Sequence, residues 1–492
     1  MRVLLVYPEF PDTFWSFKYA LRFLGKRSAF PPLGLLTVAA MLPARWEKRL
    51  VDLNVRPLHD ADLEWADVVF LSGMLVQGPS MQEQIARARA LGKRTVVGGP
   101  IVSSQDHSIA GADHQVAGEA EEIMPELIRD LERGEARPFY KSDTLPDPKL
   151  SPVPLFALAD MKRYSSMAVQ FSRGCPFTCE FCDIIEIYGR RPRTKTPGQV
   201  LAELDQLYSL GWRGRMFLVD DNFIGNKASV KALLLPLAEW MRAHRFPFTL
   251  LTEASLNLAE EDELLRGMRQ AGFTSVFLGI ETPVAASLKE TTKFQNMRGD
   301  LLESVRRIQA HGIEVMAGFI VGFDNDPPDV FDRQIQFIKE AAIPLSMVGL
   351  LTALPNTQLW RRLKSEGRLL KQSLGNNTLA DLNFVPRMDA QKLLEGYRRI
   401  LQTVYSPREY FERASAFLTQ LGSSARTPVA FADLRAAARS LWSQGLQSNY
   451  RWEYWKFLLR AARHRRQRWG KVFALAIMGH HFFELARAQE LD

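Results

Sequence analysis

The chain has only three cysteines, and all of them lie within eight positions, in the string Cys175-Pro-Phe-Thr-Cys179-Glu-Phe-Cys182. Three thiolates at this C-x3-C-x2-C spacing suit a 4Fe–4S cluster whose fourth iron has no protein ligand and can therefore bind and reduce a substrate. A structural zinc site normally has four protein ligands, and the nearest upstream histidine, His114, is far away in the sequence. A disulfide would leave one cysteine unpaired. We therefore expect Cys175, Cys179 and Cys182 to bind one cluster.

The composition indicates a globular protein with no membrane-spanning segment. Hydrophobic residues make up 46% of the 492 positions, which is enough for two or three domains with cores of their own. No uninterrupted apolar segment approaches the ~20 residues that a spanning helix needs. The apolar run that follows Met1-Arg2 is too short for a signal peptide. Because the cluster is open and no further cysteine is available, we expect the protein in the reducing cytoplasm.

The positive charge of the chain is concentrated at its C-terminal end. The formal net charge is +8, and from Arg426 onward 12 lysines and arginines stand against 5 acidic residues, an excess of +7. The stretch Tyr450–Trp469 mixes cations with aromatic residues at helical spacing. It suits a helix docked on the body with a solvated basic face, a peripheral helix on anionic lipid, or a nucleic-acid patch. We favour docking and then membrane contact, and we expect no nucleic acid because no recognised binding module accompanies the patch.

Residues 1–134 alternate short apolar runs with helical patterns, which predicts a doubly wound, Rossmann-like parallel sheet. The expected strands are Arg2–Tyr7, Lys48–Leu53, Asp67–Ser72 and Arg94–Val97, and the expected helices are Pro32–Leu42, Pro79–Leu91 and Glu121–Glu132. Such folds bind ligands beyond the carboxyl ends of their strands. The turn residues at those positions are candidate cofactor contacts: Pro8, Ser72, Gly73, Gly98, Gly99 and Pro100. A dinucleotide site is not expected because the chain lacks a G-x-G-x-x-G string.

A proline-rich linker, residues 135–164, precedes a second alternation at 165–365. The expected strands are Met167–Phe171, Arg215–Val219, Phe248–Thr252, Thr274–Gly279, Glu314–Ile320 and Ser346–Leu351. Six βα units predict a partial (β/α)6 TIM barrel with its chemistry at the carboxyl ends of the strands. Candidate catalytic carboxylates follow three of these strands: Asp220, Asp221, Glu253 and Glu281. A shared ligand explains them, and so does capping of the next helix. Residues 366–492 are expected to be helical.

The cysteine string, with the aromatic Phe181 directly before the last cysteine, resembles the motif of the radical SAM (S-adenosyl-L-methionine) family. The resemblance implies that Phe181 packs near the adenine of SAM. It also implies that residues ending the second barrel strand bind the SAM amino group, where Asp220 and Asp221 replace the family's usual Gly-Gly-Glu. Glu253 and Glu281 would reach the ribose or the methionine end of SAM. The other interpretation of these two glutamates is a helix cap or an ion pair in the barrel wall.

A doubly wound domain in front of such a barrel resembles the cobalamin-binding branch of the radical SAM family. Shared strings include Val97-Gly-Gly-Pro, Gly118-Glu-Ala-Glu and Gly279-Ile-Glu-Thr-Pro, and roughly residues 1–420 are similar to the hopanoid C-methylases and their uncharacterised relatives. Cobalamin would then lie between the domains, held by the loops at Pro8, 72–78 and 98–103. The chain has no D-x-H-x-x-G string, so His114 is not expected to bind cobalt.

The resemblance implies a cobalamin-dependent C-methyltransferase that acts on an unactivated carbon of a small-molecule or lipid substrate. One SAM would supply the methyl group, and a second SAM at the cluster would supply the radical. The alternative is a cyclisation, rearrangement or oxidation with the same cofactors, and a third hypothesis is a metal-stabilised binding protein. An electron donor such as flavodoxin or ferredoxin is an expected partner, and contact between the C-terminal tail and a membrane remains a hypothesis.

Overall fold

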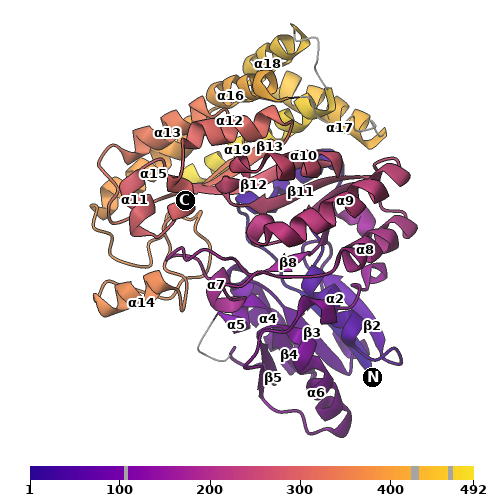
Figure 1. Ribbon diagram of the computed structural model, residues 1–492. Helices are drawn as coiled ribbons and strands as arrows, with labels where there is room; N and C mark the ends of the chain where they lie inside the picture. Colours follow the sequence, from indigo (N-terminus) through magenta and orange to yellow (C-terminus); the bar gives the residue numbers. More distant parts are fainter. Residues whose placement is uncertain (105–108, 423–430, 464–468, 492) are drawn as a thin grey trace.

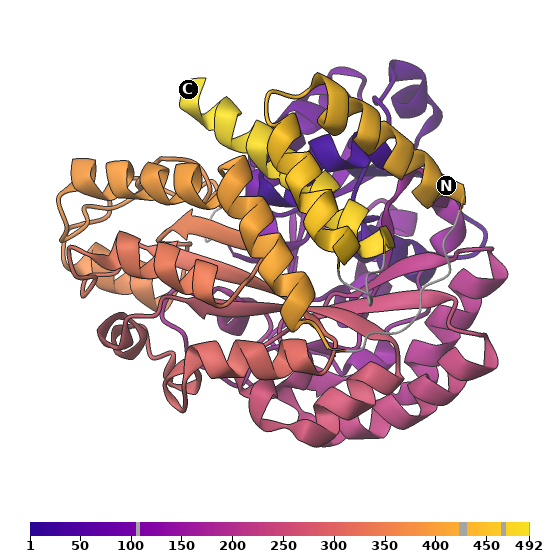
Figure 2. The same cartoon turned by 90° about the horizontal axis from the view of Figure 1, so that it is seen from above.

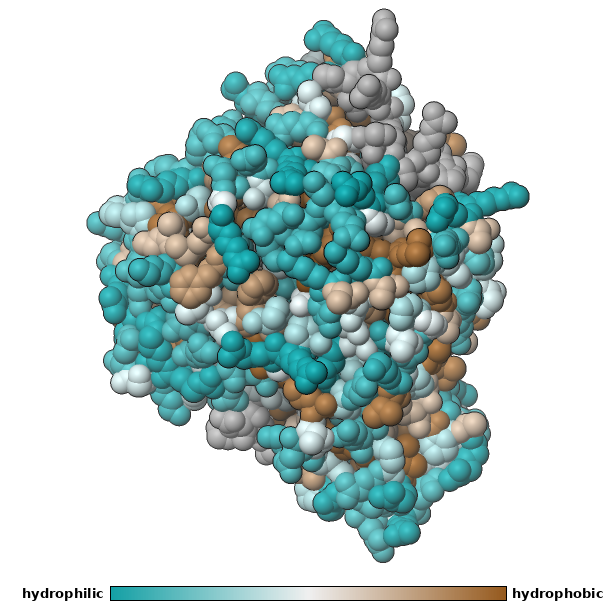
Figure 3. All heavy atoms as spheres, viewed as in Figure 1, coloured by the Kyte–Doolittle hydropathy of each residue, from teal (hydrophilic) through white to brown (hydrophobic). Residues whose placement is uncertain are grey.

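The computed structural model describes residues 1–104, 109–422, 431–463 and 469–491. Two six-stranded parallel sheets form the centres of two α/β domains, and C-terminal helices cover one end of the second domain (Figure 1). Figure 2 views the molecule from the side of these C-terminal helices. Polar residues cover most of the face drawn in Figure 3, and apolar residues reach that surface in smaller groups. None of the helices in the described part of the chain combines the length and apolarity that crossing a bilayer requires.

The first sheet has the strand order β2-β1-β3-β4-β5-β6, and every neighbouring pair is parallel. Its strands are β1 (Arg2–Tyr7), β2 (Glu47–Asp52), β3 (Val68–Ser72), β4 (Arg94–Gly98), β5 (His114–Ala117) and β6 (Phe139–Lys141). The helices in this part of the chain are α1 (Lys18–Leu24), α2 (Leu33–Met41), α3 (Asp60–Trp65), α4 (Gly78–Ala90), α5 (Pro100–Ser103) and α6 (Ala120–Arg133). Leu4 and Val6 enter one core, whereas Val3 and Leu5 enter another on the opposite face. A sheet buried on both faces is the predicted doubly wound architecture.

Two strands of this sheet, β5 and β6, were not among the expected ones. The string His-Gln-Val-Ala of β5 contains two polar residues and is therefore no continuous apolar run. The edge strand β6 has only three residues, of which Tyr140 alone is buried. It lies inside the segment 135–164 that we expected to be a linker, so the first sheet continues to Lys141. Short edge strands depend on their neighbours more than on their own pattern.

The second sheet has the strand order β14-β13-β12-β11-β10-β7. Its strands are β7 (Ser166–Val169), β10 (Gly214–Leu218), β11 (Phe248–Ala254), β12 (Phe273–Glu281), β13 (Glu314–Val321) and β14 (Ser346–Leu350). The helices between and after them are α7 (Ile184–Ile187), α8 (Pro197–Ser209), α9 (Lys227–Ala243), α10 (Asp262–Gln270), α11 (Ala285–Glu290), α12 (Leu301–Ala310), α13 (Val330–Glu340) and α14 (Gln358–Ser365). All neighbours pair in parallel, and β7 and β14 are the two ends of the sheet, so the partial barrel is confirmed.

Strand β11 alternates between buried and half-buried residues along its whole length. In β11, Phe248, Leu250 and Thr252 are buried, whereas Leu251 and Glu253 are half-buried. Since side chains along a strand point alternately to the two faces of a sheet, one face packs against the helices and the other lines the barrel interior.

The C-terminal helices pack against the barrel and against the start of the chain. They are α15 (Ala390–Val404), α16 (Pro407–Gln420), α17 (Phe431–Trp442), the π-helical η9 (Ser443–Gln447), α18 (Arg451–Arg463) and α19 (Trp469–Leu491). The ring of Phe14 stacks on that of Phe482 in α19 at 4.8 Å, and His481 bonds the Phe14 carbonyl. Helix α18 buries Tyr454, Phe457 and other residues of one face, as the docking interpretation of the tail expects.

A buried network of charges joins the two α/β domains. Glu119 and Glu121, at the start of α6, pair with Arg173 in the short strand β8 (Ser172–Arg173). Glu119 also pairs with Arg193 in β9 (Arg193–Thr194). Both glutamate side chains are 2% exposed. Although burial alone would raise it, the Arg173 guanidinium holds the pKa of Glu121 below its usual value. On the other side of the junction, Asn356 Nδ2 donates to the Ser104 carbonyl at 3.3 Å.

Replacing Arg173 with methionine is expected to destabilise the protein because it leaves Glu119 and Glu121 buried without their main counter-charge. Breaking a buried pair by removing one partner typically costs about 3–5 kcal/mol, against about 0–1 kcal/mol for an exposed pair. Arg163→Met is the matched control, because the Arg163–Asp160 pair is more than half exposed. We expect the thermal unfolding midpoint to fall by several degrees in Arg173→Met and by less than about one degree in the control. Equal shifts would contradict the importance of the network.

Candidate active site at the carboxyl ends of the barrel strands

The cysteine loop starts directly after β8 and returns through β9, which pairs with β8 in an antiparallel ribbon. Gly174 has φ +88°, and a Cβ there would lie 2.8 Å from the Gly189 carbonyl oxygen. Glycine is therefore required at the base of the loop, both for its left-handed backbone and for the close approach of the returning chain. The Cys175 amide donates to the same Gly189 carbonyl at 3.3 Å, which closes the loop.

All three cysteines are free thiols, and two of them accept side-chain hydrogen bonds that fit a cluster ligand. Asn222 Nδ2 donates to Cys175 Sγ at 3.7 Å, and Gln295 Nε2 donates to Cys179 Sγ at 3.5 Å. N–H donors to sulfur are among the features that set the potential of an iron–sulfur cluster. Burial raises the pKa of the Cys175 thiol and raises that of Cys182 further, so both favour the protonated form until a metal displaces the proton.

The arrangement of donors does not suit a single zinc ion. In the described part of the chain, no three His, Cys, Asp or Glu side chains are grouped to hold one metal ion. A zinc ion would draw its thiolates to within ~4 Å of one another because a Zn–S bond is about 2.3 Å long. A 4Fe–4S cluster offers a separate iron atom to each thiolate, so its three sulfur ligands can lie farther apart than they do around one zinc ion. The amide donors at the sulfurs support the cluster interpretation.

Asp220 and Asp221 bind the backbone at the start of the cysteine loop. Asp220 Oδ1 accepts hydrogen bonds from the Phe171 amide at 2.9 Å and from the Ser172 amide, and Asp221 Oδ2 accepts from the Gly174 amide at 2.8 Å. Burial raises the pKa of Asp220 to about 7 and that of Asp221 to about 6, although these amides oppose the shift. Among the described residues, Asp220 Oδ2 is buried without a hydrogen-bond partner. One carboxylate oxygen thus remains available at this position.

Glu253 lies next to the two aspartates, near the end of β11 rather than after it as the sequence suggested. Burial raises its pKa to about 8, and the negative charges of Asp221 and Asp220 add to the shift. The structure thus brings three of the four predicted carboxylates together beside the cysteine loop. Groups with strongly shifted pKa values in such a position are typical of functional sites.

Glu281, the fourth predicted carboxylate, is the last residue of β12 and has φ +65°, where the register with β13 shifts. Its carboxylate pairs with the buried Lys293 ammonium. In this structure Glu281 therefore forms an ion pair in the barrel wall, which is one of the roles expected for it. Lys293 also lies 5.8 Å from the centre of the Phe181 ring. Although burial lowers it, the charges of Glu281 and then Cys179 raise the pKa of Lys293. The loop after α11 therefore holds a cation beside the cysteine loop.

Sequence reasoning missed Lys293 and Gln295, and it assigned no role to Asn222. Asn222 follows Asp220-Asp221 directly and could have been included, because residues that end a barrel strand share one edge. No local pattern marks Lys293 or Gln295, since isolated polar residues in a turn are usually solvated.

A second ionic cluster anchors the far side of the cysteine loop. Arg362 in α14 pairs with Glu180, which lies between Cys179 and Phe181, and its Nη1 is 2.8 Å from Asp324. Arg368 pairs with the same aspartate at 2.6 Å. Although burial opposes it, the guanidiniums of Arg368 and Arg362 hold the pKa of Asp324 below its usual value. Asp324 thus helps to position the loop. The Phe181 ring lies 6.0 Å from that of Phe323.

The predicted cofactor loops of the first domain meet at one edge of its sheet. The Pro8 carbonyl accepts hydrogen bonds from Asn54 Nδ2 at 3.2 Å and Gln77 Nε2 at 2.6 Å. A Cβ at Gly99, which has φ +89°, would lie 2.5 Å from Ser72 Oγ and 3.0 Å from the Gly73 carbonyl oxygen.

The same edge is open and carries few side chains. Gly98 and Gly99 end β4 there, Pro100 begins α5, and a Cβ at Gly118 would meet open space. The Glu119–Arg173 pair and the Asn356–Ser104 bond show that the edge faces the barrel. A flat corrin fits such an edge. His114 lies in β5, is buried and bonds the Arg137 carbonyl at 2.8 Å, which is a structural role.

The interior face of the barrel is apolar beyond the carboxylates. Half-buried side chains of five strands line it: Phe217, Leu251, Phe277, Met316 and Met347. Two aromatic residues from the first domain join them, with Phe30 5.1 Å from Phe217 and Trp15 5.0 Å from Phe277 between ring centres. The barrel therefore offers an apolar surface next to an acidic, cysteine-bearing edge.

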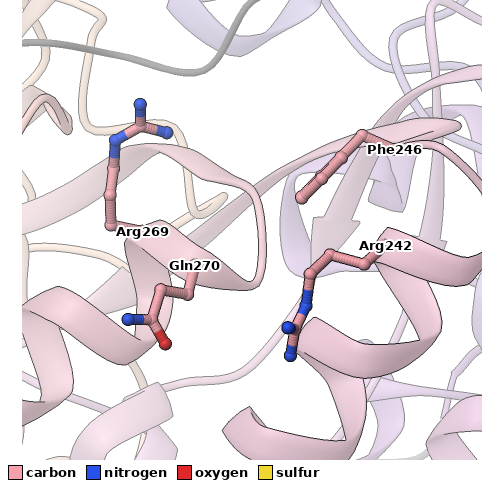
Figure 4. A pocket seen from close by; sticks show the side chains of 4 residues that line it. All are labelled: Arg242, Phe246, Arg269 and Gln270. Carbon is pink, nitrogen blue, oxygen red and sulfur yellow. The ribbon is translucent and has the colours of Figure 1, made fainter.

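A cavity of about 510 Å³ lies elsewhere, between Arg242 and Phe246 on one side and Arg269 and Gln270 on the other (Figure 4). These residues lie at or just beyond the C-terminal ends of α9 and α10, and so at the amino ends of β11 and β12. In barrels this face contributes to stability, whereas the opposite face carries the chemistry.

Comparison with known proteins agrees with this geometry. Residues 27–128 match the model of the B12 binding domain, residues 169–338 match the radical SAM superfamily, and residues 357–491 match a domain of unknown function (DUF4070). An uncharacterized methyltransferase of Synechocystis sp. is 44% identical, with 98% of this chain and 92% of the relative covered. The hopanoid C-2 methylase of Rhodopseudomonas palustris is 37% identical, with 99% and 94% covered.

A solved structure shares the fold. The radical S-adenosylmethionine methyltransferase TsrM from Kitasatospora setae, with cobalamin and a [4Fe-4S] cluster bound, gives a TM-score of 0.63 over 100% of both chains at 14% identity. The two domain matches and the two relatives that align over nearly their whole length show that this chain belongs to the cobalamin-binding radical SAM methyltransferases.

Proposed function

We propose that this enzyme transfers a methyl group to an unactivated carbon of a largely apolar, lipid-like substrate. The observation that carries the proposal is the apolar barrel interior, lined by Phe217, Phe277 and Met347 among others, directly below the cysteine loop and its carboxylates. A hydrocarbon skeleton has no polar group to direct a reaction, so it must be held by packing against such a surface. The relative named as a hopanoid C-2 methylase supports a substrate of this class.

In this proposal Cys175, Cys179 and Cys182 hold a 4Fe–4S cluster, and Pro8, Ser72, Gly73, Gly98, Gly99 and Pro100 lie around the cobalamin. When bound, the cluster and cobalamin supply one-electron reduction of SAM and carriage of the methyl group. The Asn222 and Gln295 amides donate to two of the sulfurs, and Asp220 and Asp221 fix the backbone from which the loop starts.

The acidic group Asp220, Asp221 and Glu253 would bind the positively charged methionine end of SAM. Their raised pKa values reflect burial and, to a smaller extent, repulsion by neighbouring carboxylates, which a cationic ligand relieves. Phe181 would pack near the adenine, as the family resemblance implies. The positive charge of Lys293 would stabilise the reduced cluster. Its ion pair with Glu281 would keep that carboxylate away from SAM.

Electrons would come from a small redox protein such as flavodoxin or ferredoxin, and the reaction would take place in the reducing cytoplasm. The three free cysteines support this location, because an open cluster does not survive oxidation. The methyltransferase names of both full-length relatives favour methyl transfer over cyclisation, rearrangement or oxidation.

Cys179→Ala is expected to abolish formation of 5′-deoxyadenosine from SAM under anaerobic, reducing conditions, because two thiolates cannot hold the cluster. Anaerobic assays with SAM, reductant, cobalamin and an added candidate lipid should give 5′-deoxyadenosine and S-adenosylhomocysteine together in the wild type, and a lipid product in which a methyl group replaces one hydrogen. Unchanged 5′-deoxyadenosine in the variant would refute the assignment of the cluster. A product without the added methyl group would favour the alternative reactions.

Lys293→Met is expected to lower the reduction potential of the cluster, because a cation nearby stabilises the more negative reduced state. For a one-electron couple, about 59 mV corresponds to a tenfold change in the equilibrium, and we expect a shift of roughly that size. EPR-monitored redox titration measures it. The double variant Lys293→Met/Glu281→Gln controls for the glutamate left unpaired, and Lys289→Met in α11 is the control for a cation outside the site. An unchanged reduction potential in both Lys293 variants would show that the Lys293 charge does not affect the cluster.

Glu253→Gln is expected to remove part of the pH dependence of stability. The unfolded chain ionises a glutamate near pH 4.3, whereas the folded protein keeps Glu253 protonated until about pH 8. The folded state thus binds more protons in this window, and stability is lost as pH rises from about 4.5 to 8. Thermal unfolding midpoints of the SAM-free protein should be similar for the two forms near pH 5 and higher for the variant at pH 8.5. If the difference in unfolding midpoint between the two forms does not change between pH 5 and pH 8.5, Glu253 is ionised over this whole range and the prediction is wrong.

A further inference from the structure

Helix α18 has an apolar face on each side. Its inner face, with Tyr454, Phe457, Leu458 and Ala461 at helical spacing, is buried. Three further apolar residues at spacing i, i+3 and i+7 lie on the outer side, where Trp452 is 68%, Trp455 36% and Leu459 62% exposed. Docking on the body therefore accounts for the inner face only.

The neighbouring segment extends this exposed surface. Trp442, which ends α17, is 62% exposed, and Leu446 in η9, one turn later, is 57% exposed. Trp455 Nε1 donates to the Gly445 carbonyl at 2.9 Å, so the two segments are joined at this point. We call Trp442, Leu446, Trp452, Trp455 and Leu459 the outer aromatic face. Exposed apolar groups of this size on a soluble domain mark interaction sites.

Cations surround the outer aromatic face. Helix α18 carries Arg451, Lys456, Arg460 and Arg463 but only one acidic residue, Glu453, which pairs with Lys456 at 2.7 Å. The Arg451 guanidinium lies 5.9 Å from the centre of the Trp452 ring. Helix α17 adds no cation to this face, because the Arg435 and Arg439 guanidiniums lie against α1 near Gly25, where Arg439 donates to the Arg22 and Phe23 carbonyls. Tryptophan with basic residues is the combination that binds the interface of an anionic bilayer, because the indole prefers the headgroup boundary and the cations attract acidic headgroups.

We propose that the outer aromatic face is a docking surface for an anionic lipid bilayer, with α18 lying flat on it. A second copy of this chain is a poorer partner, because like-charged cations would oppose one another across such a contact. The face lies on α17, η9 and α18, at the end of the molecule opposite the first sheet (Figure 1). Docking there leaves the junction of the two domains free. The proposal does not rest on methyl transfer, but it would bring the barrel close to an apolar substrate stored in a membrane.

Co-sedimentation of the full-length protein with vesicles tests the proposal. Vesicles of phosphatidylcholine mixed with phosphatidylglycerol should bind the wild type roughly tenfold or more tightly than phosphatidylcholine alone. Trp452→Ser/Leu459→Ser should reduce binding to the mixed vesicles by a similar factor. The matched control is Leu235→Ser in α9, because Leu235 is 63% exposed and lies outside the outer aromatic face. Arg460→Gln/Arg463→Gln should remove the preference for phosphatidylglycerol.

Two results would overturn the proposal. One is a wild type that does not bind the mixed vesicles, or variants that bind as well as the wild type. The other is a dimer in sedimentation velocity that Trp452→Ser/Leu459→Ser dissociates, which would assign the face to a second copy. Thermal unfolding and 5′-deoxyadenosine formation should match the wild type in all variants. This readout separates failure of docking from misfolding and from failure of the proposed reaction.

Discussion

Asp220 and Asp221 carry the constraint on which the rest of the site depends, because they hold the backbone where the cysteine loop leaves the barrel. Their oxygens accept the amide hydrogens of Phe171, Ser172 and Gly174, immediately before the first cysteine. Carboxylates that bind several amides in a buried place are strong anchors, since each bond is charge-assisted. Burial raises the pKa of Glu253 to about 8, and the same two charges beside it add to the shift. The anchor of the loop is therefore also the electrostatic environment offered to a cationic ligand.

Ion pairs from different parts of the chain also hold the cysteine loop, at its base and at Glu180. Arg173 and Arg193 tie its base to the first domain through Glu119. Arg362 of α14 reaches Glu180 within the loop, and Lys293 lies on the side of Cys179 and Phe181. Buried charges are costly unless they are paired, so each pair restricts the loop to the geometry that satisfies it. The network makes the position of the first domain and the position of the cysteines depend on one another.

Apolar surface has two separate uses in this chain. Inside the barrel, Phe217, Phe277 and Met347 form a surface that only a substrate or the first domain can cover. Outside, the C-terminal helices pack on the barrel with one face and leave the outer aromatic face uncovered among cations. In the proposed function, an apolar substrate covers the first surface. The charge around the second surface determines which partner could cover it.

The sequence by itself determined the cluster motif, the order of the two α/β domains and most of the strands, because thiol spacing and apolar periodicity are local properties of the chain. It also placed Asp220, Asp221 and Glu253 at one edge, since parallel strands end on the same side. The strands β5 and β6 were not predicted, because they are short and are stabilised by their neighbours in the sheet.

Only the tertiary structure decided what each carboxylate contacts. Glu281 pairs with Lys293, twelve residues away, and Glu119 pairs with Arg173, more than fifty residues away. No local pattern encodes such pairs, because a buried charge is matched by whichever opposite charge the fold brings to it. For the same reason, the sequence could not show whether Trp452 and Leu459 are exposed. Which face of an aromatic helix is buried depends on the surface against which the chain packs it.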